Sequence, residues 1–484
     1  MLGDGLLRAV PWGLNLALCV GALVGAAALV VRRHRRRVGP DAPWLALTAL
    51  LLGAASLRRA SEALAFFDVV ALALVLALGL RSAQGVRVAA LGVAQHLRAL
   101  ADAAVHAATG AVRLLWRDIS WREALGEGRL GRLRAVTLGV GLAAPVVVLF
   151  GALFASADAV FANLVNRVFR IEASTVLEHA ALWAACAGVT AGYLNGLLQP
   201  RPRQAGPAAG PGPFLGIVPV GVALGLVNLL FLLFVVIQLR YLFGGEQVVL
   251  QTTGLTFAEY ARRGFFELVA VSGLSLPLLL GADWAIRGES FAGRRTFRWL
   301  AGLTLALLLV VMASALERMR LYVAEFGLSE DRLYATAFMV YLFGLFAWFG
   351  WTVLRGRRRG FAFGGLIQGL AVLAGLHLLN PDAVIAGVNL DRAAAGHRFD
   401  GPYLTSLSAD AVPVLLRRLP KLAPEARCEV AGRLLERWGN PESVGDWRSW
   451  NWSRARARQL VAAREADLRR LAASPPCGSP HPAP

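Results

Sequence analysis

The chain contains 484 residues, of which 57% are hydrophobic and 17% are charged. The apolar residues come in long blocks, which excludes an ordinary soluble protein and predicts an all-α, polytopic bundle of transmembrane helices. The formal net charge of +19 would suggest a nucleic-acid partner in a soluble protein. Here the arginines cluster at the ends of the apolar blocks, so the expected partners are the lipid bilayer and anionic lipid headgroups, with no nucleic acid.

The first apolar block, residues 11–31, is followed directly by the basic run Arg32–Arg37. A cleaved signal peptide would carry its positive charges before the apolar block and small residues after it. The reverse order predicts a retained helix whose C-terminal end faces the cytoplasm.

Residues 43–57 and 63–80 are predicted to form a helical hairpin, with Arg58 and Arg59 between them. The first of these blocks is short for a span; if it does not cross the membrane, every element up to the end of the hairpin changes side. Asp68 lies inside the second block, where a carboxylate should face other helices or take up a proton.

The basic segment 81–134 is mildly amphipathic and is predicted to be cytoplasmic. Its residues His96, Arg98, Asp102 and His106 recur at helical spacing, so two histidines and a carboxylate could share one face of a helix. A solvated or membrane-surface helix is favoured over a metal site.

Seven further apolar blocks bring the total to about ten predicted spans, with both chain termini outside the cytoplasm. In this arrangement the inner connections hold 24 arginines and the short outer ones about 11, as the positive-inside rule requires. The further blocks are residues 135–155, 176–198, 214–239, 264–282, 299–316, 333–354 and 361–379.

A densely charged bridge, residues 314–334, joins two of the most apolar blocks. Gly327 suits the left-handed residue that ends a helix, and Ser329 suits a helix N-terminus. The turn between the two helices is therefore predicted to take only about two or three residues. The helices would extend past the apolar layer and carry a polar cap, composed of Glu317, Arg318, Arg320, Tyr322, Glu325 and Arg332.

Within this cap, Glu317 and Arg320 lie three residues apart and can pair along their helix. Arg318 faces a different side, from which it could reach Glu267 or Asp382. Glu267 lies about one helical turn inside the apolar block 264–282, which is a costly position unless the carboxylate meets a partner.

The outer ends of the predicted helices gather polar residues that could line one recess for an anionic headgroup, a sugar phosphate or an ion. The favoured alternative is a salt-bridged lid that only fixes helix packing. The sequence contains no HExxH, Walker-type, GxSxG or thiol-histidine signature, so no catalytic residue, metal or cofactor is predicted. The candidate ligand-binding residues are Glu267, Glu317, Arg318, Arg320, Tyr322, Asp382 and Asn389.

Residues 380–484 are predicted to form a small helical soluble domain outside the cytoplasm, with a disordered end. The expected division is residues 1–134 as N-terminal helices with a basic loop, 135–379 as the main membrane domain, and this tail. Cys428 and Cys477 could form a disulfide if the tail is exported.

Four blocks of residues support a resemblance. They are Glu317-Arg-Met-x-Leu-Tyr322 with Gly327-Leu328 and Arg332-Leu-Tyr334, the block from Glu259 to Leu268, Asn380-Pro-Asp-Ala383, and Ser408-Ala-Asp-Ala-Val-Pro413. Together they resemble a family of uncharacterised bacterial multi-pass membrane proteins, a domain of unknown function, over about residues 135–415. The resemblance implies a helical bundle of the bacterial cytoplasmic membrane with an outer C-terminal tail, and it implies no activity, substrate or cofactor.

The favoured function is a non-enzymatic scaffold, sensor or accessory component of the bacterial envelope, which could bind an envelope protein or a lipid headgroup. A secondary transporter or channel is the first alternative, and it requires a polar path that includes Asp68 or Glu267. A membrane-embedded transferase acting on a lipid-linked substrate is the second alternative, with Glu317, Arg318 and Asp382 at its centre.

Overall fold

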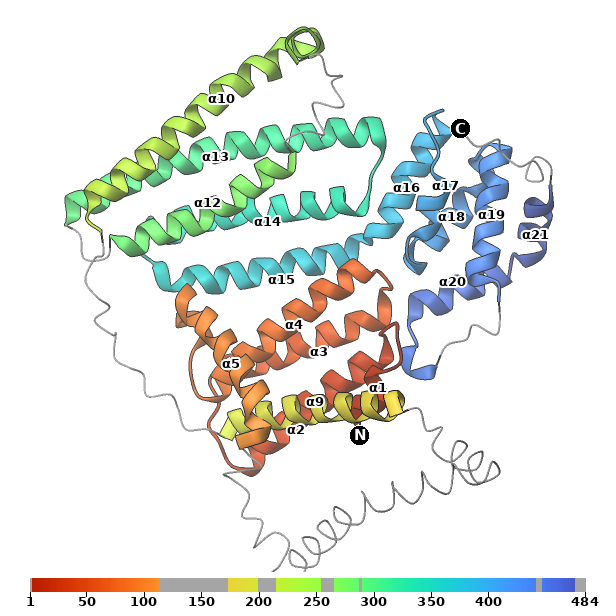
Figure 1. The fold of residues 1–484 in the computed structure, drawn as a ribbon, viewed down its shortest axis with the longest axis horizontal. Coiled ribbons are helices and arrows are strands. Elements are labelled where there is room, and N and C mark those ends of the chain that lie inside the picture. Colours follow the sequence, from red (N-terminus) through yellow and green to blue (C-terminus); the bar gives the residue numbers. More distant parts are fainter. Residues whose placement is uncertain are drawn as a thin grey trace, which may run out of the picture.

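The structure is a computed structural model, and it describes residues 2–113, 173–198, 215–253, 265–286, 290–440 and 446–474. In these residues it is all-α, and the long helices lie side by side (Figure 1). The predicted span 135–155, the residues Glu259 to Gly264 and Cys477 lie outside the described ranges. The helices before the tail are α1 (Leu2–Leu7), α2 (Leu14–Arg33), α3 (Ala42–Arg58), α4 (Glu62–Ala83), α5 (Val93–Arg113), α9 (Ala173–Leu198), α10 (Ile217–Thr253), α12 (Phe265–Ala285), α13 (Phe291–Phe326), α14 (Glu330–Thr352) and α15 (Phe361–Leu379).

Eight of the described helices are long and apolar enough to cross a membrane, namely α2, α4, α9, α10, α12, α13, α14 and α15. The short block in the predicted hairpin forms α3, an apolar helix of 17 residues that packs against both α2 and α4. The chain is therefore a multi-pass membrane protein with a helical bundle, as its hydropathy predicts.

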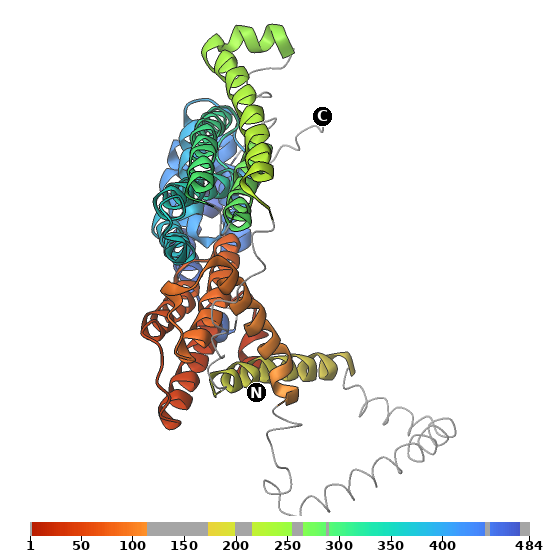
Figure 2. The ribbon, with the colours of Figure 1, turned by 90° about the vertical axis from the view of Figure 1, so that its left-hand side faces the viewer.

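The bundle has two main groups of buried side chains. One group is shared by α10, α12, α13 and α14, and the other by α2, α3, α4, α15 and the tail. Helix α15 lies between α14 and α4 and packs against both, so it joins the two groups (Figure 1). Viewed from the side, α13, α14 and α15 form a narrow upright stack, and α9 lies across the lower part of the bundle (Figure 2).

The tail lies together at one end of the bundle (Figure 1). The backbone N–H of Leu14, at the start of α2, donates to the carbonyl of Trp450 in the tail at 2.9 Å. The ends of α3 and α13 and the starts of α4 and α14 also contact tail residues. The tail helices are α16 (Pro381–Ala394), α17 (Gly401–Ser406), α18 (Val412–Arg418), α19 (Pro424–Trp438), α20 (Trp452–Ala462) and α21 (Glu465–Ala473), with the 3-10 turns η4 (Ala409–Ala411), η5 (Leu419–Lys421) and η7 (Trp447–Ser449).

Basic residues mark the opposite end of the bundle. Arg358, in the connection from α14 to α15, donates two hydrogen bonds to one carboxylate oxygen of Asp283, at 3.0 and 2.7 Å. The guanidinium of Arg355 lies 3.8 Å above the ring of Trp351. The helices therefore alternate in direction as the predicted hairpins require, with these arginines at the end away from the tail.

Helix α5 packs against α9 and α4, and its polar residues make separate local contacts. Asp102 pairs with Arg81 of α4, and the imidazole of His106 bonds to the backbone carbonyl of Asp102 at 2.6 Å. His96 bonds to the carbonyl of Gly92 at 3.1 Å. Within the described ranges no group of three or more metal-ligating side chains occurs.

Candidate functional site

The turn between α13 and α14 is short, as predicted, because Gly327 ends α13 with a φ of 78° and a ψ of −180°. Only glycine adopts this backbone conformation readily. A Cβ at this position would also lie 2.4 Å from the side-chain oxygen of Asn389. Ser329 occupies the position before α14 without a side-chain capping bond. The first N–H of α14, that of Glu330, instead donates to the hydroxyl of Tyr403 in the tail at 2.9 Å.

Two residues of α16 hold this turn. The amide of Asn389 accepts from the Leu328 N–H at 2.8 Å and donates to the Leu328 carbonyl at 2.7 Å. The guanidinium of Arg392 donates to the carbonyls of Ala324 and Glu325, at the C-terminal end of α13. These carbonyls have no partner within their own helix, so Arg392 caps it. Asn389, a predicted ligand-binding residue, thus stabilises the turn through these two hydrogen bonds.

The remaining cap residues form separate small contacts. Glu317 and Arg320 pair at 3.7 Å, as predicted, but both side chains are exposed, so the pair contributes little stability. Arg332 stacks on Tyr322, with the guanidinium carbon 3.9 Å from the ring centre. Arg318 is the buried member of the group.

Arg318 contacts α10, which corrects the expectation that it reaches Glu267 or Asp382. Its guanidinium donates at 2.8 Å to the side-chain oxygen of Gln238, and the hydroxyl of Ser314 donates to the same oxygen at 3.2 Å. Sequence reasoning missed Gln238 because a lone amide in an apolar block carries no signal for its partner. Glu267 is exposed on the first turn of α12. The described contacts therefore do not gather the seven predicted residues into one recess.

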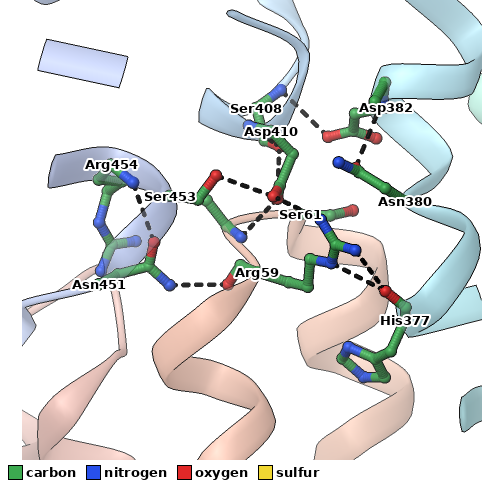
Figure 3. A network of polar contacts seen from close by, with 12 residues as sticks. Arg59, Ser61, His377, Asn380, Asp382, Ser408, Asp410, Asn451, Ser453 and Arg454 are labelled. Carbon is green, nitrogen blue, oxygen red and sulfur yellow. Dashed lines mark hydrogen bonds and ion pairs between the residues drawn. The ribbon is translucent and has the colours of Figure 1, made fainter. Parts of the chain in front are cut away.

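A different set of polar residues meets where the tail contacts the helix ends, and we call it the polar junction (Figure 3). At its centre is Asp410 of η4, which is almost fully buried. Its carboxylate accepts from the Ala60 N–H at 2.7 Å and the Ser453 hydroxyl at 2.8 Å, and it pairs with Arg59 at 3.3 Å. The members of the polar junction are Arg59, His377, Asp382, Ser408, Asp410, Asn451 and Ser453.

Arg59 connects three parts of the chain at this point. Besides pairing with Asp410, its guanidinium donates two hydrogen bonds to the backbone carbonyl of His377, at 2.9 and 2.5 Å. That carbonyl belongs to the last turn of α15. The side chains of Arg59 and Asp410 are only 9% and 2% exposed and are bonded to further groups, so the pair meets the condition under which a buried ion pair is tolerated.

Asn451 caps two helices at once and is fully buried. Its side-chain nitrogen donates to the carbonyls of Ser56 and Arg59, at the C-terminal end of α3, at 2.8 Å each. Its side-chain oxygen accepts from the Arg454 N–H at 3.0 Å, in the first turn of α20. One amide thus bonds to two unpaired carbonyls at the end of α3 and to an unpaired N–H at the start of α20.

Asp382 lies in the first turn of α16, after Asn380, which adopts the left-handed conformation. One carboxylate oxygen accepts from the Ser408 N–H at 3.2 Å, and the other is buried without a hydrogen-bond partner. Burial raises the pKa of the Asp382 carboxyl above its ordinary value, and the nearby charge of Asp410 raises it further, against the opposing bonds from Ser408. The structure therefore places this predicted site residue in the polar junction.

Asp68, inside α4, faces another helix, as predicted. Its carboxylate oxygen lies 2.9 Å from the Nε2 atom of His377 on α15. The two residues are 309 positions apart in the sequence. This contact lies beside the polar junction, since the His377 carbonyl binds Arg59.

The tail also carries a basic groove between α16 and α18, with a volume of about 510 Å³. Arg418 crosses the groove, donating to the Gly387 carbonyl at 2.8 Å and pairing with Asp391, whose pKa this contact lowers. The groove combines apolar and basic residues: its lining is Ala383, Val384, Gly387, Val388, Asp391, Val414, Arg417, Arg418 and Lys421.

Sequence reasoning missed Arg59, Asp410, Asn451 and Ser453 as members of a site. Arg59 sits in a short connection where positive charge is expected for topology alone. Asp410 lies in the block Ser408 to Pro413, which is one of the four that support the family resemblance. That block is the sequence signal that could have pointed to Asp410. Their partners in other elements of the chain lie 43 to 395 positions away, so no local pattern identifies them.

No curated protein and no solved structure matches the chain. A family model described as a domain of unknown function, DUF4153, matches residues 46–418. The match begins within α3, well before the predicted start at about residue 135, and it ends with α18. It includes Arg59, His377, Asp382 and Asp410 of the polar junction. Because the match spans most of its length, the chain belongs to the DUF4153 family.

Proposed function

We propose that this protein is a non-enzymatic component of the bacterial envelope, whose tail binds anionic lipid headgroups at the membrane surface. The observation that carries the proposal is the basic groove of the tail. Arg417, Arg418 and Lys421 border it, against the single carboxylate of Asp391. Guanidinium and ammonium groups at a membrane surface attract anionic headgroups, with about 1 kcal/mol for each cation.

The position of the groove supports a lipid rather than a soluble ligand. Helix α15 ends at Leu379 and α16 begins at Pro381, so α16 continues almost directly from a membrane-spanning helix. Ala383 and Val384 of the groove lie within about 8 Å of that end along the helix, at 1.5 Å per residue. The apolar floor of the groove therefore starts near the depth of the headgroups.

The fixed attachment of the tail supports a scaffold role. The polar junction binds the tail to the end of α3 and the start of α4, and Arg392 and Asn389 bind it to the end of α13 and the turn that follows. A tail on a flexible linker would sample many orientations, whereas this one holds the basic groove at a constant angle to the bundle. Such an arrangement suits a protein that presents a lipid or an envelope protein partner at a defined place.

We place the tail outside the cytoplasm and the bundle in the bacterial cytoplasmic membrane. Arginine-rich connections such as 355–359 lie at the end away from the tail, which is the end that the positive-inside rule assigns to the cytoplasm. Cys428 of α19 is disulfide-bonded, whereas Cys19 and Cys186 are free. A structural disulfide supports an oxidising compartment for the tail.

The test is binding of a short-chain, water-soluble phosphatidylglycerol to the full-length protein in nanodiscs, compared with the matching phosphatidylcholine. We expect the protein to prefer phosphatidylglycerol. The double variant Arg417→Gln with Lys421→Gln should weaken that binding by about 30-fold, which corresponds to about 1 kcal/mol for each lost cation.

The matched control is the double variant Arg469→Gln with Arg470→Gln, which removes two exposed arginines from α21. It lowers the net charge equally but leaves the basic groove intact, so phosphatidylglycerol binding should stay within about twofold of the wild type. Equal binding of the two lipids, or equal loss in the two variants, would show that the groove is not a headgroup site.

A secondary transporter is the second candidate, and the Asp68–His377 contact favours it. Titratable pairs between membrane-spanning helices occur in proton relays. The test is proton flux in proteoliposomes containing a pH-sensitive dye. A transporter should lose flux with Asp68→Asn and keep it with Glu267→Gln, because Glu267 is exposed on α12. The transferase alternative gains no support, since Glu317, Arg318 and Asp382 bind different partners.

A further inference from the structure

An apolar groove of about 570 Å³ lies between α4 and α14, with α15 as its floor. Its lining residues all belong to helices long and apolar enough to cross the membrane. Phe67, Val70 and Leu74 form one wall, and Ala337 and Phe338 belong to the other. Val70 and Phe338 are about half exposed, so this part of the two walls borders an open space.

The groove exists because α4 and α14 both pack on α15 without filling the space between them. Its floor includes two glycines of α15, Gly365 and Gly369. A Cβ on Gly369 would be 3.5 Å from the ring of Tyr341, and the Tyr341 hydroxyl donates to the Gly365 carbonyl at 3.3 Å. The tyrosine hydroxyl is thus satisfied and leaves the floor apolar.

The length of the groove matches one leaflet. Along α15 its lining extends from Gly365 to Leu376, which is about 16 Å at 1.5 Å per residue. The hydrocarbon core of a bilayer is about 30 Å thick, so each leaflet supplies about 15 Å of chain.

Most of the groove lies in the leaflet on the tail side. Its α14 wall, residues 334–341, and three of the four α4 residues lie in the helix halves nearer the tail, while the floor on α15 extends past the middle of that helix to Gly365. At that end Phe67 and Tyr334 contact each other, with ring centres 5.6 Å apart. The Tyr334 hydroxyl bonds to Ser61 at 3.3 Å, one residue after Ala60, whose N–H donates to Asp410 of the polar junction.

We propose that this groove holds one acyl chain of a phospholipid from the tail-side leaflet as a resident lipid. Inside the membrane an apolar space of this size gains nothing from water, which would lose its hydrogen bonds there. The hydrocarbon chain is the only abundant molecule at this depth, and its length matches the groove. The site shares no residue with the basic groove of the tail, so the two can be tested separately.

The experiment is native mass spectrometry of the full-length protein, purified from nanodiscs of phosphatidylethanolamine and phosphatidylglycerol and then exchanged into detergent. The wild type should retain one phospholipid. Ala71→Phe on α4 and Ala337→Phe on α14 each place a ring in the groove from one wall. Each should lower the retained fraction about tenfold or more, because the ring displaces several methylene groups from their contacts.

Ala223→Phe is the matched control, since it adds the same ring to an exposed alanine of α10, away from the groove. Its lipid retention should equal that of the wild type, and the thermal unfolding of all four proteins should agree within a few degrees. If one groove variant fails to fold, the other still provides the comparison. Retention of no phospholipid by the wild type, or equal retention by the groove variants and the control, would overturn the proposal.

Discussion

Arg59 and Asp410 form a buried ion pair 3.3 Å long, although 351 positions separate them in the sequence. Arg59 follows α3 in the helix bundle, and Asp410 belongs to η4 in the tail. The pair therefore joins the two parts of the protein at a place where their other polar groups also meet (Figure 3). This contact helps to fix the tail, and the basic groove that it carries, against the helix bundle.

Replacing Asp410 by asparagine should destabilise the docked tail by about 3–5 kcal/mol, because Arg59 keeps its charge in a buried place without a counter-ion. The measurement is thermal unfolding of the purified protein, together with the rate at which trypsin cleaves the tail. Asp467→Asn on α21 removes an exposed carboxylate and should change neither. An Asp410→Asn protein with wild-type unfolding would show that the pair does not hold the tail.

Asn451→Asp separates the two capping roles of this residue. One oxygen of the aspartate still accepts from the Arg454 N–H. The other oxygen replaces the amide nitrogen and therefore faces the carbonyls of Ser56 and Arg59 without a hydrogen to donate. We expect a loss of about 2–4 kcal/mol, from two lost hydrogen bonds and a buried repulsive contact. Asn451→Ala loses the α20 cap as well. If the Asp and wild-type proteins unfold at the same temperature, the contact with α3 is unimportant.

Gly327→Ala should destabilise the turn between α13 and α14 for two reasons, the positive φ and the clash with Asn389. Gly356→Ala is a matched control, because Gly356 has a similar φ of 82° with open space around it. Strain at a positive φ costs about 1–3 kcal/mol, and the control shows the size of that part; the extended ψ of Gly327 adds backbone strain of its own. The unfolding temperature should fall further for Gly327→Ala than for Gly356→Ala. Equal falls would contradict the close approach of Asn389.

The burial of Asp382 predicts a dependence of stability on pH. Its pKa in the folded protein lies above the ordinary value of 3.8, so folding disfavours the charged form. Below about pH 4 the carboxyl is protonated in both states, and as the pH rises above this value the unfolded state alone loses the proton. The contribution of Asp382 to stability therefore falls as the pH rises.

Asp382→Asn removes this effect, since the asparagine amide stays neutral and its oxygen can accept from the Ser408 N–H. Relative to the wild type, the variant should gain stability between pH 4 and pH 7, as measured by unfolding temperature at each pH. Ser406→Ala, at an exposed position nearby, should give a curve parallel to that of the wild type. Parallel curves for Asp382→Asn and wild type would contradict the raised pKa.

The membrane helices could be predicted from the sequence because hydropathy is a local property. The turn at Gly327 and the pair of Glu317 and Arg320 were equally local, and the structure confirms both. The hydrogen-bond partner of Arg318 could not be predicted, because an arginine near a helix end can reach any neighbouring helix. Its partner Gln238 is a single amide within an apolar block. The polar junction could not be predicted for the same reason, because no sequence pattern relates Asp410 to Arg59.

Hydrogen exchange of the full-length protein in nanodiscs tests most directly whether the tail is fixed to the helix bundle. Two backbone amides of the bundle donate to tail residues: that of Ala60 to the Asp410 carboxylate, and that of Leu14 to the Trp450 carbonyl. A fixed tail predicts that both exchange slowly in the wild type, as slowly as the ends of α3 and α20, and that both become fast together in Asp410→Asn. Fast exchange of these two amides in the wild type would contradict a fixed tail, and with it the constant placement of the basic groove.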